Sequence, residues 1–131
     1  MAAFSNYLED QITGWIAGTS MTAPTATFVQ LYNGDPTDAG SGGTALFTRY
    51  QVASGAGSWT RGTGGNGTIT NASAFTITSS ATATASATYV AVFDASAAGN
   101  LLFYGALTTA KTIASGDEVK FNASALTLTV A

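Results

Sequence analysis

The chain has 131 residues, a length typical of one domain, and alanine, threonine, glycine and serine fill more than half of its positions. Charged residues make up 8% of the sequence, against about 25% in an ordinary soluble domain, and seven acidic and four basic residues give a net charge of −3. A composition without a basic stripe argues against direct binding to nucleic acid and against a polybasic membrane anchor. We therefore expect a single domain over residues 1–131, with a helix in 1–18 and a β-sandwich in 23–131.

The sequence contains no cysteine and no histidine. Disulfides, thiolate nucleophiles and structural zinc sites are thereby excluded, and the commonest general base is missing. The carboxylates fall in predicted turns or on the polar face of a predicted helix, which predicts a protein that is not an enzyme and has no cofactor. No segment approaches the run of about 18 apolar residues that a membrane span needs, and the first residues lack the features of a secretory signal. We expect no membrane partner.

The first segment has the spacing of an amphipathic α-helix. Glu9 and Asp10 lie in its first half, where the helix dipole favours acids, and Gly18 is placed to end it in a left-handed cap. Gly14, inside the helix, suggests close packing on its side. Six apolar residues share one face: Phe4, Tyr7, Leu8, Ile12, Trp15 and Ile16. This face is our candidate interface, with packing on the domain's own core as the alternative.

From Ala23 onward, apolar residues follow the two-residue period of β-strands, interrupted by glycine, proline, asparagine and aspartate. Short strands at such spacing predict a mainly β fold, an antiparallel β-sandwich of jelly-roll or immunoglobulin-like type, led by one N-terminal amphipathic helix. The predicted strands are residues 25–32, 46–52, 68–70, 74–78, 81–93, 101–107, 118–122 and 125–130.

Two groups of oxygen-bearing side chains resemble calcium ligands, which must number six to eight. Asn33, Asp35 and Asp38 form the first group, and Asp94 with Asn100 forms the second. Neither has the spacing of a known calcium loop, and the same residue types favour turns. We therefore assign both groups to turns and predict no metal site.

Three other sequence patterns could bind a ligand, but each has a simpler structural explanation. The glycine-rich segment 62–67 lacks the lysine of a phosphate-binding loop and reads as a hairpin loop. Trp59, Arg61 and Tyr50 would suit a sugar-stacking patch, although a sandwich core explains the aromatic rings more simply. Hydroxyl rows along strands suit ice or glycan binding, or merely the high β propensity of threonine. These rows are Thr76/Thr78, Thr82/Thr84 and Thr127/Thr129.

Five segments carry a further signal: residues 4–9, 22–24, 35–40, 99–108 and 115–117. Together, in this order along the chain, they resemble a family of small virion proteins of tailed phages, described variously as tail fibre or capsid-associated structural proteins. The resemblance implies a virion component that is assembled in the host cytoplasm, and it assigns no catalytic residues to this chain.

A charge-poor, hydroxyl-rich surface suits repeated contact with neighbouring proteins, because interface cores are depleted of charge. Together with the resemblance, the short chain without a long coiled coil or repeat region predicts a capsid decoration or cement protein that stabilises the shell through contacts with the major capsid protein or other virion proteins. The alternative is a short tail or head fibre subunit that contacts host surface glycans, followed by a carbohydrate-binding module of non-viral origin. We also expect the chain to associate with itself, as a dimer or trimer.

Overall fold

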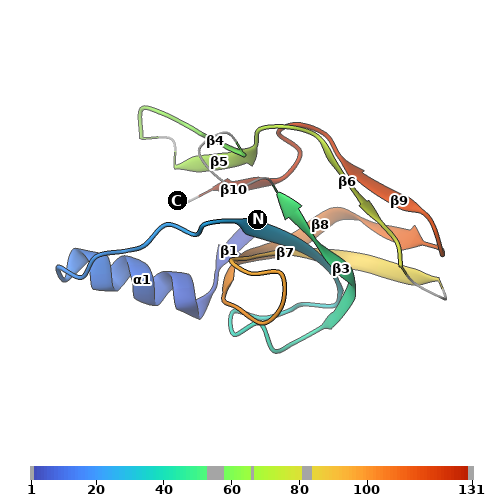
Figure 1. Ribbon diagram of the computed structural model, residues 1–131, viewed down its shortest axis with the longest axis horizontal. Coiled ribbons are helices and arrows are strands. Elements are labelled where there is room, and N and C mark those ends of the chain that lie inside the picture. The colour runs from blue at the N-terminus through green and yellow to red at the C-terminus, as the bar shows by residue number, and fades with distance from the viewer. Residues whose placement is uncertain (1, 53–57, 66, 81–83, 130–131) are drawn as a thin grey trace.

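The computed structural model describes residues 2–52, 58–65, 67–80 and 84–129. Strands stack in two layers, and helix α1 (Asn6–Ile16) projects at one end while β6 and β9 lie toward the other (Figure 1). One layer is a five-stranded antiparallel sheet in the order β1-β8-β7-β2-β3. Its strands are β1 (Ala2–Phe4), β8 (Leu101–Ile113), β7 (Ala85–Phe93), β2 (Thr27–Asn33) and β3 (Thr44–Val52).

The second layer consists of two smaller antiparallel sheets, and together the layers confirm the predicted β-sandwich with a single leading helix in the described part of the chain. The three-stranded sheet has the order β10-β5-β4, and β6 pairs with β9. The strands are β10 (Thr127–Thr129), β5 (Thr68–Asn71), β4 (Trp59–Arg61), β6 (Phe75–Thr78) and β9 (Glu118–Phe121).

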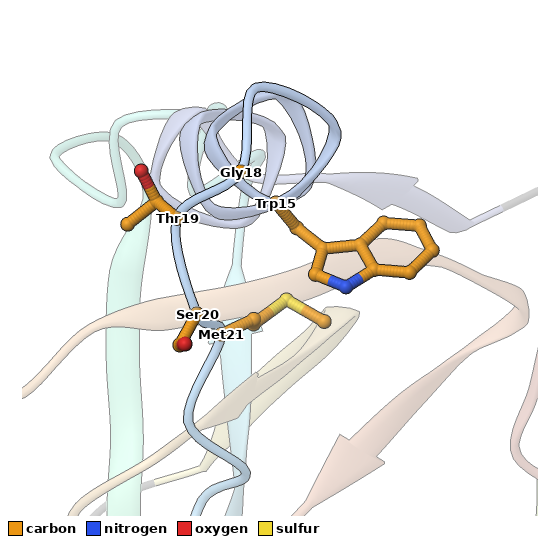
Figure 2. A pocket seen from close by; sticks show the side chains of 5 residues that line it. All are labelled: Trp15, Gly18, Thr19, Ser20 and Met21. Carbon is orange, nitrogen blue, oxygen red and sulfur yellow. The ribbon is translucent and has the colours of Figure 1, made fainter.

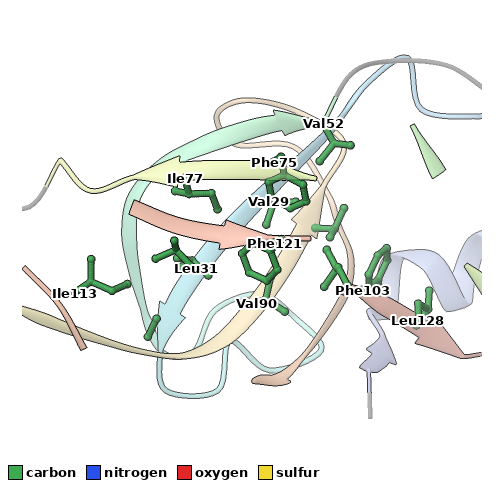
Figure 3. Close-up of a cluster of buried hydrophobic side chains, with 14 residues drawn as sticks. Val29, Leu31, Val52, Phe75, Ile77, Val90, Phe103, Ile113, Phe121 and Leu128 are labelled. Carbon is green, nitrogen blue, oxygen red and sulfur yellow. The ribbon is translucent and has the colours of Figure 1, made fainter. Parts of the chain in front are cut away.

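The main core lies between the two layers, because alternate residues of each strand point inward (Figure 3). Aromatic rings link the sheets: Tyr50 stacks on Phe75 with ring centroids 5.1 Å apart, and Phe75 stacks on Phe121 at 5.0 Å. The buried residues of this cluster are Val29, Leu31, Val52, Phe75, Ile77, Ala87, Val90, Val92, Phe103, Ile113, Val119, Phe121, Leu126 and Leu128.

Asn71 is a fully buried polar residue at the end of β5. Its side-chain oxygen accepts a hydrogen bond from the Leu126 N–H at 2.9 Å, while its Nδ2 donates to the carbonyls of Ser73 at 2.9 Å and Asn122 at 2.8 Å. A buried amide is tolerated only when its polar atoms are paired, and here it joins β5 to the turn before β10.

Two strand pairs of the large sheet have irregular register: the outer pair β2–β3 and the inner pair β7–β8. The β2–β3 register shifts between Val29 and Leu31, where Phe47 has a positive φ of 63°, and Gln30 Nε2 donates to the carbonyls of Leu46 and Phe47 at 2.6 and 2.9 Å. The β7–β8 pairing shifts as well. At the β3 edge such a bulge hinders the addition of another chain, whereas at the other edge β1 pairs with β8 without a register shift.

The strand predictions were largely correct, with differences at the ends. Strand β8 continues to Ile113, six residues beyond its predicted end, and residues 81–83 of the predicted strand 81–93 lie outside the described residues. Strands β1 and β4 were missed, because three-residue strands offer too few residues for a period to appear.

Helix α1 is capped at both ends by its own sequence. The Ser5 side chain accepts from the Leu8 N–H at 3.2 Å, which satisfies one of the unpaired donors of the first turn. At the other end Gly18 has a φ of 95°, its N–H donates to the Trp15 carbonyl, and the Thr19 N–H donates to the Gly14 carbonyl. This Schellman motif confirms the predicted left-handed cap.

The close packing suggested by Gly14 is not observed. A side chain at this position would meet only the Thr19 Cβ at an ordinary 3.8 Å, because this face of α1 has open space. We therefore expect the Gly14→Ala variant to be more stable than the wild type by about 0.5–1 kcal/mol, since alanine has the higher helix propensity. Urea unfolding measures this change, and a lower stability would show that the helix packs against something at this position.

Candidate interaction surface

The start of α1 is fixed to the large sheet through Ser5, which is buried. Its N–H donates to the Leu102 carbonyl at 3.1 Å, its hydroxyl donates to the Leu101 carbonyl, and the Asn6 N–H donates to the Asp38 carbonyl at 3.1 Å. These bonds hold the N-terminal end of the helix at the start of β8 and at the loop that follows β2.

Phe4 does not lie on the helix, so this part of the predicted helical face is wrong. It belongs to β1, where it pairs with Phe103 of β8 and packs against the main core. The extended conformation of Ser5, with φ −82° and ψ 161°, separates strand from helix. The helical spacing gave the wrong assignment because an apolar residue just before the helix fits the apolar pattern of a helix and of a strand equally well.

The remaining five residues of the predicted face lie on α1, and none of them is buried. Tyr7, Leu8 and Ile12 are half-buried, whereas Trp15 and Ile16 are 62% and 74% exposed. The helix therefore does not contribute an ordinary core face, which was the alternative left open by the sequence. Its apolar residues become progressively more exposed toward the C-terminal end.

Trp15, Ile16 and Met21 form what we call the end patch. They are the large hydrophobic residues that the structure exposes in its described part, and Met21 is 47% exposed. Figure 2 shows the side chains of Trp15 and Met21 extending to the same side of a hollow of about 400 Å³, which Gly18, Thr19 and Ser20 complete. Trp15 and Met21 face one hollow, and the exposed Ile16 follows Trp15 at the same end of the helix. Large apolar side chains exposed together in this way indicate an interaction surface.

An apolar groove of about 350 Å³ adjoins the end patch, between α1 with the following segment and the β4-β5-β10 sheet. Met21 belongs to both features. Sequence reasoning missed the groove, because its walls come from segments more than a hundred residues apart and no local pattern joins them. Its lining residues are Tyr7, Leu8, Gln11, Met21, Thr22, Ala23, Pro24, Thr27, Trp59, Ile69, Asp94, Leu102, Phe103 and Leu128.

Trp59 forms a fixed part of the groove wall. Its indole N–H donates to the Thr27 hydroxyl at 2.9 Å, and its ring meets the Phe103 ring edge-on, with centroids 5.8 Å apart. Tyr50 stacks on Phe75, and both Tyr50 and Trp59 pack against the main core, as the sequence favoured; the alternative sugar-stacking patch with Arg61 is not assembled. Trp15 and Trp59, the two tryptophans of the chain, thus line the end patch and the groove.

Three of the five candidate calcium ligands, Asp35, Asp94 and Asn100, stabilise turns, whereas Asn33 ends strand β2 and Asp38 lies in the loop that follows. Asp35 Oδ1 accepts from the Thr37 N–H at 2.8 Å, and the Asp94 carboxylate accepts from the Asn100 N–H at 2.7 Å and from Asn100 Nδ2 at 2.8 Å. Within residues 2–52, 58–65, 67–80 and 84–129, no group of three or more acidic side chains is placed to hold a metal ion.

Arg49 is held against the outer face of the large sheet. Its guanidinium carbon lies 3.6 Å from the centroid of the Phe93 ring, and Nη1 donates to the carbonyls of Ala95 and Ala98 at 2.8 and 2.7 Å. Burial lowers the pKa of Arg49 and raises the pKa of the neighbouring Tyr32 phenol. The Arg49 guanidinium thus binds groups of its own chain.

The glycine-rich segment and the threonine rows, the other patterns considered for a ligand, are a hairpin loop and strand residues. Segment 62–67 connects β4 to β5 as a hairpin, with the Gly62 N–H donating to the Thr68 carbonyl at 2.7 Å; Asn66 lies outside the described residues. Thr78, Thr127 and Thr129 are exposed on strands, and Thr76 is half-buried. Thr84 is exposed ahead of β7, while Thr82 lies outside the described residues.

Comparison with known families decides the broad class of the protein. The family model described as podophage GP4 fiber I protein gp80 matches residues 3–129, nearly the whole chain. The chain belongs to this family. It is therefore a phage virion structural protein, and the resemblance stated from the sequence segments is confirmed. No curated protein matches the chain. None of the helices in the described part of the chain is long and apolar enough to cross a membrane.

Proposed function

We propose that this protein is a non-catalytic fibre subunit of a tailed-phage particle, attached to neighbouring virion proteins by its helix end. The exposure of Trp15, Ile16 and Met21 at the helix end carries the proposal, because Trp15 and Met21 line one hollow and Met21 also lines the apolar groove. Isolated exposed hydrophobic residues are common on monomers, but a contiguous apolar surface marks a contact site. The family description, which names a fiber protein, supports the fibre assignment over decoration of the shell.

The position of this surface fits an attachment role. The end patch lies where α1 projects from the sandwich, so a partner can reach it without displacing a strand (Figure 1). The irregular pairing of the edge strand β3 disfavours assembly by strand addition at that edge of the large sheet. We keep two further predictions. The protein associates with itself as a dimer or trimer, which light scattering of the purified protein tests, and it contacts host surface glycans.

Particles produced without the protein test the fibre assignment. We expect electron microscopy of such particles to lack density at discrete projections, adsorption to cells to fall, and resistance of the shell to heat to remain unchanged. Adding the purified protein back should restore projections and adsorption. Uniform loss of density over the shell, together with opening at a lower temperature, would instead establish decoration, because a protein that binds the assembled shell stabilises it by mass action.

A further inference from the structure

A second apolar cluster covers the outer face of the large sheet, on the side away from the main core. Val90 and Val92 of β7 belong to the main core, so the residues that alternate with them point outward. These outward residues are Tyr89, Ala91 and Phe93, and the last two are buried within the second cluster. The outer face of the sheet thus carries aromatic side chains of its own.

The strand register gathers three tyrosines on this face, which we call the tyrosine surface. Tyr32 of β2 lies directly opposite Tyr89 of β7. Tyr104 of β8 lies opposite Ala91 on one side and opposite Ala3 of β1 on the other. Side chains opposite one another in antiparallel strands share a face, so the three tyrosines stand together. Tyr32 is buried, whereas Tyr89 and Tyr104 are half-buried, and the small, exposed Ala3 covers little of the Tyr104 ring.

The loop that follows β2 brings negative charge to this surface. A side-chain carbon added at Gly40 would contact the Leu101 side chain at 3.5 Å, so the loop lies against the second cluster. Burial, and then the negative charges of three exposed carboxylates, raise the pKa of the Tyr104 phenol, which therefore stays protonated at neutral pH. These carboxylates belong to Asp35, Asp38 and Glu9. The tyrosine surface thus has an acidic rim beside Tyr104.

The polar groups of the tyrosine surface are open to a ligand. In the part of the chain that the structure describes, the hydroxyls of the three tyrosines make no hydrogen bond, and neither do the carboxylates of Asp38 and Glu9. Tyr32 is 6% exposed, yet its hydroxyl reaches solvent, because no buried side-chain oxygen among the described residues lacks a partner. A protonated phenol donates and accepts, whereas a carboxylate only accepts. A ligand that satisfies all of these groups must offer both donors and acceptors.

We infer that the tyrosine surface binds a neutral glycan. Sugar hydroxyls both donate and accept, and the apolar face of a sugar ring packs on an aromatic side chain. A lysine side chain has donors only, so it would leave the phenol hydroxyls without acceptors. The acidic rim repels sugars that carry a carboxylate or a phosphate. The site shares no residue with the end patch or the groove, and it gives the contact with host glycans, which rests on the proposed fibre function, a place of its own.

A panel of immobilised neutral and acidic oligosaccharides, probed with the intact protein, tests this site. We expect binding to neutral members and none to members that carry a carboxylate or a phosphate. Calorimetry then measures the affinity for the strongest neutral binder. Tyr89→Phe/Tyr104→Phe removes two hydroxyls that make no hydrogen bond in the described structure, so the variant should fold like the wild type. Its affinity should fall about tenfold, because each hydroxyl contributes one hydrogen bond to the ligand.

Tyr50→Phe is the matched control, because Tyr50 stacks on Phe75 and packs against the main core on the inner face of the sheet. It should bind the glycan like the wild type. Equal affinities for the outer-face variant and the wild type, a preference for acidic glycans, or no binding to the panel would overturn the inference. Binding of polylysine without binding of any glycan would also overturn it and assign the surface to cations. Binding of the protein to particles is measured separately, so failure on the panel leaves attachment through the end patch intact.

Discussion

The Asn71→Ala variant should lose about 3 kcal/mol or more of its free energy of unfolding, a large share of the stability of a domain of this size. Asn71 is 0% exposed, and its side chain satisfies the buried Leu126 N–H and two backbone carbonyls. Alanine would leave these groups unpaired and open a small cavity. Urea unfolding followed by circular dichroism gives the change directly.

Two further variants separate hydrogen bonding from volume. Asn71→Leu restores the lost volume without the polar atoms, and it should be as damaging as alanine. Asn122→Ala removes an exposed amide next to the same network and should change stability by less than about 0.5 kcal/mol. A small loss for both Asn71 variants would show that the turn before β10 is held by its apolar contacts instead.

The strands and the helix were predictable because their periods of two and 3.6 extend over several residues. The helix cap at Gly18 was predictable for a similar reason: it depends on one residue and the few carbonyls before it. Strand β1 was missed because it is stabilised by pairing with a strand that is distant in the sequence. Its partner is β8, about a hundred residues away, and the buried Ser5 that ends it reads in the sequence as a common polar residue.

The candidate site was only half predictable. An amphipathic pattern identifies the apolar face of a helix, but it does not say whether that face is buried. The backbone hydrogen bonds of Ser5 and Asn6 fix the orientation of the helix relative to the sheet, and in this orientation Trp15 and Ile16 are exposed. Trp59 packs against the core, as the sequence favoured, but its place in the groove wall, like that of Met21, depends on tertiary structure.

The Trp15→Gln/Ile16→Gln variant should bind particles that lack the protein about a hundredfold more weakly than the wild type. Truncating a buried interface anchor commonly costs about 2 kcal/mol, roughly thirtyfold in affinity, and losses at neighbouring anchors are not additive, so we expect the two together to cost about a hundredfold. Glutamine keeps good helix propensity, so the stability of the free domain should change by less than about 0.5 kcal/mol. Sedimentation of labelled protein with particles measures the affinity.

A matched control uses the same substitution on another exposed surface. Thr109→Gln/Ala110→Gln, on β8, should bind particles like the wild type. Point variants are preferable to deletion of residues 1–18, because that deletion also removes β1 from the large sheet and exposes core side chains. Equal binding by the helix variant and the control would remove the end patch from the attachment surface.

Site-specific photo-crosslinking in assembled particles tests attachment through the helix end most directly. A benzophenone amino acid replaces Ile16 in one preparation and Thr109 in another, and the cross-linked products are identified by mass spectrometry. We predict a product that joins position 16 to a different virion protein, with little or none from position 109. Products from position 109 and none from position 16 would contradict attachment through α1.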